Sequence, residues 1–212
     1  MKKINIIEFK KKNSVIDASN YLFNYFSKTK KNNVVLTGGN SVQPIYKILF
    51  KKIKSKNIKM NIFLSDERVV SLNSKNLNAN LFIKLADHKI KLNSMIKKRK
   101  KLNASIYDYE KKLPAFPKII LLTVGQDGHI ASIFKDTLAT TSKKKIIYNN
   151  KVHNSFKRIT ITLNYLKNKK NLFLLCTNKR LKIFNDLIKK RGSVLNLLFK
   201  INPKFKLLLI RN

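Results

Sequence analysis

An almost uninterrupted apolar run, Ile119–Val124, is followed directly by the polar segment Gly125-Gln126-Asp127-Gly128-His129. A run that is apolar on both faces predicts a strand buried in the middle of a parallel sheet, because a strand with one wet face alternates between apolar and polar residues. Parallel neighbours cannot be joined by a hairpin and need a crossover, usually through a helix. The chain is therefore expected to alternate strands with helices.

The rest of the sequence shows this alternation. Apolar runs predict further strands at Ile4–Phe9, Val34–Leu36, Ile62–Leu64, Ile159–Leu163, Leu172–Cys176 and Leu207–Ile210. Apolar residues spaced three and four apart predict amphipathic helices at residues 15–26, 45–49, 77–85, 105–113 and 181–188. This order predicts an α/β, Rossmann-like fold with a mainly parallel sheet and helices on both faces.

We expect a single domain over residues 1–212. The chain contains no internal repeat and no linker rich in Pro, Gly or Ser. The polar stretch Thr137–Ser155 has the weakest pattern, and we expect it to be an excursion within that domain. A chain of this length can bury one substantial core, since domains of roughly 100–200 residues are typical.

Composition excludes several other classes of protein. No apolar run approaches the roughly 20 residues needed to cross a bilayer, and the apolar stretch near the N-terminus is too short for a signal peptide. The single cysteine, Cys176, excludes an internal disulfide, and its place in an apolar run is typical of an inert core thiol. We therefore expect a cytoplasmic protein with no membrane partner.

The charge of the chain allows two interpretations. Lys and Arg number 47 against 10 Asp and Glu, which gives a net charge of +37. Such an excess is typical of nucleic-acid-binding proteins. However, lysine is spread along the whole chain and arginine, the better bidentate ligand of phosphate and guanine, occurs six times. Lys, Asn, Ile, Phe and Tyr share A/T-rich codons, so we expect no specific nucleic-acid partner, and a field that favours anionic small molecules.

Three chemically distinctive segments follow predicted strands. They are Gly38–Ser41, Asp66–Arg68 and Gly125–His129. In open parallel sheets the carboxyl ends of the strands lie at one edge, where ligands bind. We therefore expect the three segments to form one site, although each has an ordinary structural explanation when taken alone.

The first segment, Gly38-Gly39-Asn40-Ser41, lies between a strand and a helix. Glycines let backbone N–H groups approach a ligand, and a helix N-terminus favours an anion. The segment therefore indicates phosphate binding, or else a turn capped by Asn or Ser. Its glycine spacing matches neither a P-loop nor a dinucleotide fingerprint.

The second segment places Asp66, Glu67 and Arg68 directly after an apolar strand. The guanidinium of Arg68 can hold a phosphate or a carboxylate through two parallel hydrogen bonds. The alternative is a surface turn with a local ion pair. Two adjacent acids are unusual in a chain that has ten in all, which favours the functional interpretation.

The third segment places His129 in a strand-to-helix turn that opens onto the expected cleft. Histidine can act as a general base near neutral pH, and Asp127 can orient it or bind sugar hydroxyls. A histidine that caps a helix is the alternative. His88 and His153 lack such a setting and are expected at the surface, so neither a metal nor a cofactor is predicted. No G-x-S-x-G elbow marks a serine nucleophile.

Together these segments resemble the 6-phosphogluconolactonase family. The family pattern LGxGxDGHTASLF is similar to Leu122–Phe134, and the pattern SGGSTPxxLY is similar to Thr37–Tyr46. The DERxVP motif resembles Asp66–Ser71, and the R(I/V)TxT stretch resembles Arg158–Thr162. The resemblance extends over about residues 30–200.

The resemblance implies the fold shared by the lactonases, glucosamine-6-phosphate deaminases and ribose-5-phosphate isomerases. It also implies hydrolysis of 6-phospho-D-glucono-1,5-lactone to 6-phospho-D-gluconate in the oxidative pentose phosphate pathway, without a cofactor. His129 and Asp127 would be the catalytic pair. The residues expected to bind the substrate and its phosphate are Gly38, Gly39, Asn40, Ser41, Asp66, Arg68, Asn78, Gly125, Gly128, Arg158 and Lys179.

The sequence departs from the family pattern at several positions. Asn40 replaces a serine, the motif proline is displaced to Pro44, and Ser71 and Thr123 replace a proline and a glycine. The family's Thr-Gly-x-x-Lys segment is reduced to Thr177-Asn178-Lys179, which makes Lys179 a candidate only.

A deaminase is the closest alternative. Its patterns, Asp-Glu-Tyr and Gly-His-Ile-Gly-Phe, differ from this chain at Arg68 and at Ala131-Ser132, which favours the lactonase. A basic, non-catalytic nucleic-acid-binding relative is the third possibility, and the oligomeric state stays open.

Overall fold

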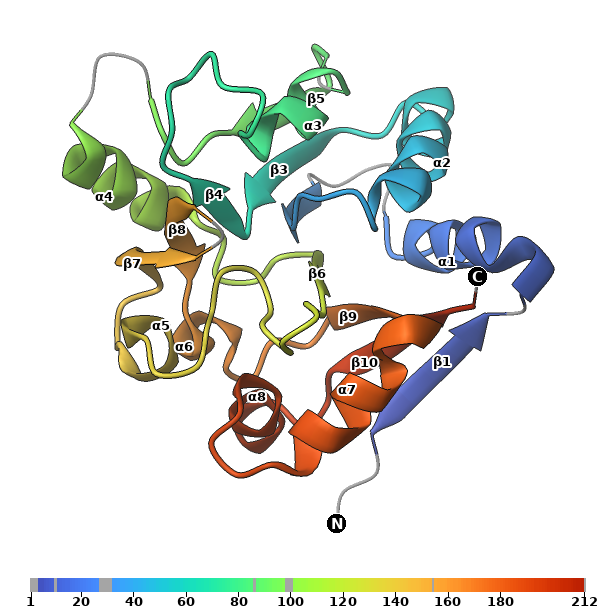
Figure 1. Ribbon diagram of the computed structural model, residues 1–212. Helices are drawn as coiled ribbons and strands as arrows, with labels where there is room; N and C mark the ends of the chain where they lie inside the picture. Colours follow the sequence, from blue (N-terminus) through green and yellow to red (C-terminus); the bar gives the residue numbers. More distant parts are fainter. Residues whose placement is uncertain are drawn as a thin grey trace.

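The computed structural model describes residues 4–9, 11–26, 32–85, 87–97, 101–153 and 155–211, and its centre is a seven-stranded parallel sheet (Figure 1). The strand order is β1-β10-β9-β6-β2-β3-β5, so β6 lies in the middle, as its apolar sequence predicts. The strands are β1 (Asn5–Phe9), β2 (Asn32–Leu36), β3 (Met60–Leu64), β5 (Ile90–Asn93), β6 (Ile119–Thr123), β9 (Leu172–Thr177) and β10 (Lys206–Ile210).

Helices cover both faces of this sheet, which confirms the predicted fold class. The helices α1 (Ser14–Phe23) and α2 (Gln43–Ser55) pack against each other on one face, and α7 (Asn178–Lys189) packs with α8 (Val194–Ile201) on the other (Figure 1). Right-handed crossovers that run in opposite directions along the sheet require this division. The remaining helices are η1 (Lys11–Asn13), α3 (Ala79–Ile83), α4 (Leu102–Lys112), α5 (Leu138–Thr141) and α6 (Leu163–Leu166).

Helix α2 shows how the sequence pattern becomes packing. Its buried residues recur three and four positions apart, so they share one face of the helix. They are Ile45, Tyr46, Leu49, Phe50 and Ile53. Full burial of each such side chain contributes roughly 1.5–3 kcal/mol, so this face fixes α2, and with it the loop that precedes α2, to the sheet.

A second, three-stranded antiparallel sheet was not predicted. It has the order β4-β8-β7 and consists of β4 (Asp66–Arg68), β7 (Ile146–His153) and β8 (Phe156–Ile161). Of the run Ile159–Leu163, which was expected to be a further strand, residues 159–161 lie in β8, outside the main sheet, and Leu163 begins α6. The weakly patterned stretch from Thr137 to Ser155 contains α5 and β7.

The strands β6 and β9 at the centre of the main sheet are buried along almost their whole length. Cys176 is buried in β9, as predicted, and burial raises the pKa of its thiol to about 11. Within the described ranges, we find no helix of the length and apolar character needed to cross a membrane.

Candidate active site

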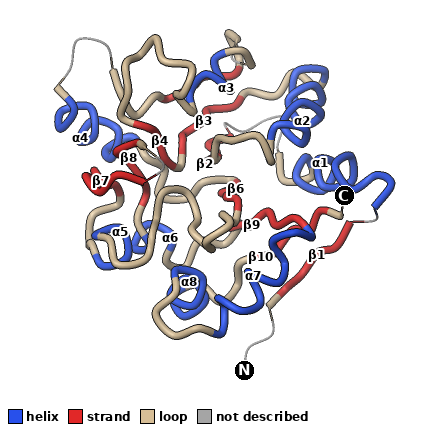
Figure 2. The backbone as a smooth tube through the Cα atoms, viewed as in Figure 1, coloured by secondary structure: helices blue, strands red, loops and turns tan. Residues whose placement is uncertain are grey.

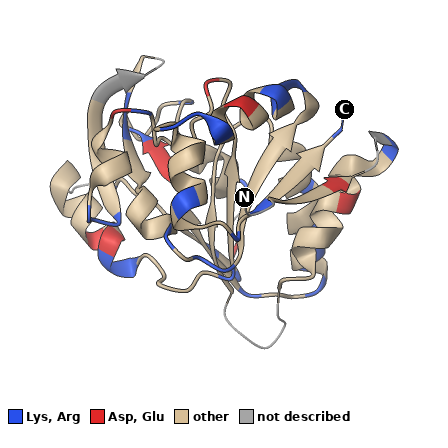
Figure 3. Cartoon of the chain, turned by 90° about the horizontal axis from the view of Figure 1, so that it is seen from below, with Lys and Arg blue, Asp and Glu red and all other residues tan. Residues whose placement is uncertain are grey.

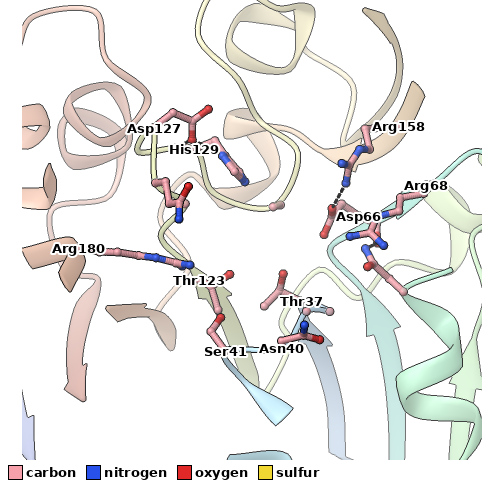
Figure 4. A pocket seen from close by; sticks show the side chains of 16 residues that line it. Thr37, Asn40, Ser41, Asp66, Arg68, Thr123, Asp127, His129, Arg158 and Arg180 are labelled. Atoms are coloured by element: carbon pink, nitrogen blue, oxygen red, sulfur yellow. Dashed lines mark hydrogen bonds and ion pairs between the residues drawn. The ribbon is translucent and has the colours of Figure 1, made fainter. Parts of the chain in front are cut away.

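The carboxyl ends of β2, β3, β6 and β9 surround a cavity of about 480 Å³ (Figure 4). It brings together all three segments singled out by the sequence. Its lining residues are Thr37, Gly38, Gly39, Asn40, Ser41, Asp66, Arg68, Asn78, Thr123, Gly125, Gln126, Asp127, His129, Ala131, Arg158 and Arg180.

The loop after β2 brings main chain to one wall of this cavity. Helix α2 begins at Gln43, with Pro44 in its first turn, so the loop leads into a helix N-terminus as expected. A Cβ atom on Gly38 would lie 2.7 Å from the side chain of Asn78, which is a clash. Only glycine lets this loop approach Asn78 so closely. The Tyr46 hydroxyl donates to the Thr37 carbonyl at 3.0 Å and secures the start of the loop.

The segment after β6 differs from the expected strand-to-helix turn. It is a folded loop that continues to α5, which begins at Leu138 (Figure 2). The loop forms its own backbone bonds, from Gly125 N–H to the His129 carbonyl at 2.8 Å and from Gly128 N–H to the Gly125 carbonyl at 3.2 Å. Because these groups bond within the turn, no helix starts there.

Gly125 makes room for the imidazole ring. A Cβ atom at this position would lie 2.3 Å from two ring atoms of His129, so any other residue would displace the ring. Gly128 permits the turn itself, because its φ is +81°, a value that residues other than glycine rarely adopt. Gly128 is not among the residues that line the cavity, and its contact with the substrate stays a prediction.

His129 and Asp127 form a hydrogen-bonded pair at the mouth of the cavity. His129 Nδ1 contacts Asp127 Oδ1, and the same carboxylate oxygen accepts from the His129 backbone N–H at 3.2 Å. The hydrogen bond to the His129 ring lowers the pKa of Asp127 to about 2. Phe134 packs against the imidazole with ring centroids 4.8 Å apart. Figure 4 shows the ring directed into the cavity.

Asp66 organises the opposite wall. Its side chain is buried, and its Oδ1 accepts from the Ser65 hydroxyl at 2.9 Å while its Oδ2 accepts from the Ser132 hydroxyl at 2.6 Å. Arg158 Nη1 lies 4.0 Å from the same Oδ2. Both carboxylate oxygens are thus hydrogen-bonded within the protein, and Asp66 also lines the cavity. Ser132 was not among the residues expected in the site.

Two arginines project from paired positions of the second sheet. Arg68 on β4 is opposite Arg158 on β8 in the ladder. Arg68 Nη1 donates to the Asn76 carbonyl at 2.8 Å, whereas its buried Nε has no hydrogen-bond partner among the described residues. Burial lowers the pKa of Arg158, and the positive charge of Arg68 acts in the same direction, while Asp66 opposes it.

Glu67 joins this arginine-bearing strand to α3. Its Oε1 accepts from the backbone N–H groups of Arg68 and Asn78, both at 2.7 Å, and its Oε2 accepts from Ala79 N–H at 2.9 Å. Burial raises the pKa of Glu67 to about 7, against the opposing effect of these three donors. Asn78 in turn donates from Nδ2 to the Asp66 carbonyl at 3.1 Å, so its side chain is fixed beside the glycine loop.

The sequence also matches a known family. The family model of glucosamine-6-phosphate isomerases and 6-phosphogluconolactonases matches residues 15–193. The chain belongs to this family. The resemblance read from the sequence motifs is therefore confirmed.

Relatives from this family cover most of the chain. A probable 6-phosphogluconolactonase of Dictyostelium discoideum is 27% identical over 168 residues, which are 72% of this chain and 71% of that protein. The crystal structure of 6-phosphogluconolactonase from Thermotoga maritima superimposes with a TM-score of 0.79 at 19% identity, covering 99% of this chain and 100% of that one. A monomeric glucosamine-6-phosphate deaminase superimposes with a TM-score of 0.78 at 14% identity, covering 99% and 98%. The fold is therefore common to both branches of the family.

Lys179, like Gly128, was expected to contact the substrate and does not line the cavity. Lys179 is exposed at the start of α7, whereas its neighbour Arg180 lines the cavity and donates from Nη1 to the Val124 carbonyl at 2.5 Å. The sequence signal for Arg180 was its place just after the carboxyl end of β9. Of the other two histidines, His88 is exposed and the side chain of His153 lies outside the described residues.

Proposed function

We propose that the protein hydrolyses 6-phospho-D-glucono-1,5-lactone to 6-phospho-D-gluconate. The observation that carries the proposal is one cavity that contains both the His129–Asp127 pair and a glycine loop with three arginines. A histidine–carboxylate pair that shares a cavity with cationic side chains suits a sugar lactone that carries a phosphate. Two sequence relatives, including the one from Dictyostelium discoideum, bear the name of this activity.

His129 acts as the general base in this proposal. The contact of its Nδ1 with the Asp127 carboxylate favours the tautomer with the proton on Nδ1 and the lone pair on Nε2. Nε2 takes a proton from water, whose oxygen attacks C1 of the lactone. As the tetrahedral intermediate collapses, the bond from C1 to the ring oxygen breaks, and His129 returns the proton to that oxygen. Backbone N–H groups of the glycine loop are the candidates to stabilise the oxyanion.

The phosphate binds between the arginines, with Arg180 on one side of the cavity and Arg68 and Arg158 on the other (Figure 4). Backbone N–H groups of Gly38–Ser41 would receive it, together with Arg68, Arg158 and Arg180. Arg180 takes the place that the sequence assigned to Lys179. Binding energy from this remote anion holds C1 near the imidazole, which converts binding into rate.

A lactone assay tests the proposal. The substrate is generated in situ, and its decay is compared with and without protein. We expect His129→Ala to lower kcat by roughly 10²–10⁴-fold with little change in binding of the product, because general-base assistance contributes about that factor. Decay at the uncatalysed rate in the presence of the wild type would reject the function. Full kcat in His129→Ala would reject the base.

The deaminase branch supplies the second candidate, since its fold is the same. Ammonia release from glucosamine 6-phosphate would identify it, and we expect none. A nucleic-acid-binding role would instead give DNA binding that weakens steeply with salt. The cytoplasmic location and the absence of a nucleic-acid partner stay predictions.

A further inference from the structure

We propose that Phe156 is a positioning residue that holds Arg68 and Arg158 in the orientation needed to bind the substrate phosphate. This inference rests on the proposed function, because it assigns the two arginines to the phosphate. Phe156 does not itself line the cavity, so it would act through the two guanidinium groups.

The ring contacts both guanidinium groups. The Cζ atom of Arg68 lies 5.5 Å from the ring centroid of Phe156, and that of Arg158 lies 5.8 Å from it. Phe156 and Arg158 are both in β8, two residues apart, and β8 pairs with β4 so that Arg68 is opposite Arg158. One aromatic side chain therefore lies within cation–π distance of both arginines.

The electrostatics explain why such a ring is useful. Two guanidinium groups side by side repel each other, and Arg68 lowers the pKa of Arg158 accordingly. Arg158 Nη1 lies 4.0 Å from the carboxylate of Asp66, and Ser132 and Ser65 already donate to the two oxygens of that carboxylate. The negative face of an aromatic ring offsets positive charge without adding a second carboxylate, which would repel phosphate.

Substitution of Phe156 by leucine separates the effect of the aromatic ring from that of an apolar side chain as such. Phe156→Leu keeps an apolar side chain in β8 and removes the π face, so both arginines lose a common support. We expect KM for the lactone to rise roughly tenfold while kcat changes by less than about twofold, since the two cation–π contacts are each worth a few-fold in affinity. Phe156→Tyr keeps the ring and should restore KM.

The matched control is Tyr148→Leu. Tyr148 lies on the neighbouring strand β7 and is half-buried, and the described residues place no arginine over its ring. This variant loses an aromatic side chain from the same hairpin. It should leave KM unchanged, whereas a merely structural role of Phe156 would make the two leucine variants alike in KM.

Two measurements decide the outcome independently. The first is steady-state kinetics of the wild type and the three variants. The second is calorimetric binding of 6-phospho-D-gluconate, which needs no turnover. A higher KM and weaker binding in Phe156→Leu, with rescue by Phe156→Tyr, support the proposal. Unchanged KM and binding in Phe156→Leu, or a tyrosine variant as weak as the leucine variant, overturn it. If the wild type binds 6-phospho-D-gluconate but does not hydrolyse the lactone, the proposed function is wrong. The binding measurements alone then test the role of Phe156.

Discussion

The imidazole of His129 is placed by its immediate neighbours. Asp127 is two residues away and bonds to both the ring and the backbone N–H of His129. Gly125 leaves the space in which the ring lies. A turn of five residues thus fixes the position of the His129 ring.

This pair makes stability depend on pH in the acid range. The pKa of Asp127 falls from 3.8 to about 2 in the folded protein, because its carboxylate bonds to the His129 ring. A depressed pKa contributes stability that is fully present above pH 3.8 and is lost as the pH falls toward 2. The side chain is half exposed, so solvent screening keeps this contribution small.

We therefore expect Asp127→Asn to be less stable than the wild type near neutral pH, and the difference to narrow as the pH falls. Urea unfolding of both proteins, from about pH 6 down to the lowest pH at which the wild type stays folded, measures it. A stability difference that stays constant, or widens, over this range would contradict the assignment of the carboxylate.

Among individual residues, those at the carboxyl ends of the predicted strands form most of the cavity wall. Gly38–Ser41, Asp66, Arg68 and His129 are all found there. Ser132 was not predicted, because it contacts Asp66 from 66 positions away in the sequence and no local pattern indicates that contact. The roles of the individual residues stay predictions until the variants are measured.

Among the elements, the three-residue strand β4 contributes side chains both to the cavity and to the N-terminus of α3. Alternate residues of a strand point to opposite faces. Asp66 and Arg68 therefore share the cavity side of β4, and Glu67 points the other way, to the N-terminus of α3. A charged strand so short has no apolar period, and for this reason the sequence did not reveal it or the antiparallel sheet to which it belongs.

Substitution of Glu67 tests this connection. In Glu67→Gln an amide NH₂ replaces one oxygen, so one of the three buried backbone N–H groups would face a donor instead of an acceptor. We expect the free energy of unfolding to fall by about 1–3 kcal/mol, the cost of an unsatisfied buried group. A raised pKa means that ionisation of Glu67 takes stability from the wild type as the pH rises through about 7. Urea unfolding near pH 5, where Glu67 is uncharged in the folded protein, therefore measures the substitution without that loss.

Glu8→Gln provides the reference for that measurement. Glu8 pairs with Arg211 on the surface, where the side chains of both residues are exposed. Its substitution should change the free energy of unfolding by less than about 0.5 kcal/mol. An equal effect of the two substitutions would show that Glu67 does not secure α3.

For the molecule as a whole, the excess of positive charge is distributed rather than gathered. In Figure 3, Lys and Arg occur on helices, strands and loops across the view. A net charge of +37 still creates a long-range field that attracts anions. The field comes from charges at the surface, and salt at 0.1 M screens it with a decay length of about 10 Å.

We expect kcat/KM for the phosphorylated lactone to fall as NaCl rises from about 0.05 M to about 0.5 M, because salt screens the attraction between the protein and the anionic substrate. We expect kcat to stay nearly constant, because it describes the reaction of substrate that is already bound. Steady-state assays over this range measure it. Glucono-1,5-lactone, which has the same ring without the phosphate, is the control and should show no such trend. A flat response for the phosphorylated substrate would mean that the surface charge does not assist binding.

The position of β10 between β1 and β9 has a consequence for the order of assembly. Asn5 of β1 is paired with Lys206 of β10, almost the full length of the chain away. Contacts between such remote segments form slowly, since a very long loop must close first. The strand β1 can therefore pair only after β10 has joined the sheet, and until then the edge of β9 is open to pairing with a strand from another molecule. Refolding from denaturant is thus a competition between closure and intermolecular pairing, and dilution favours closure.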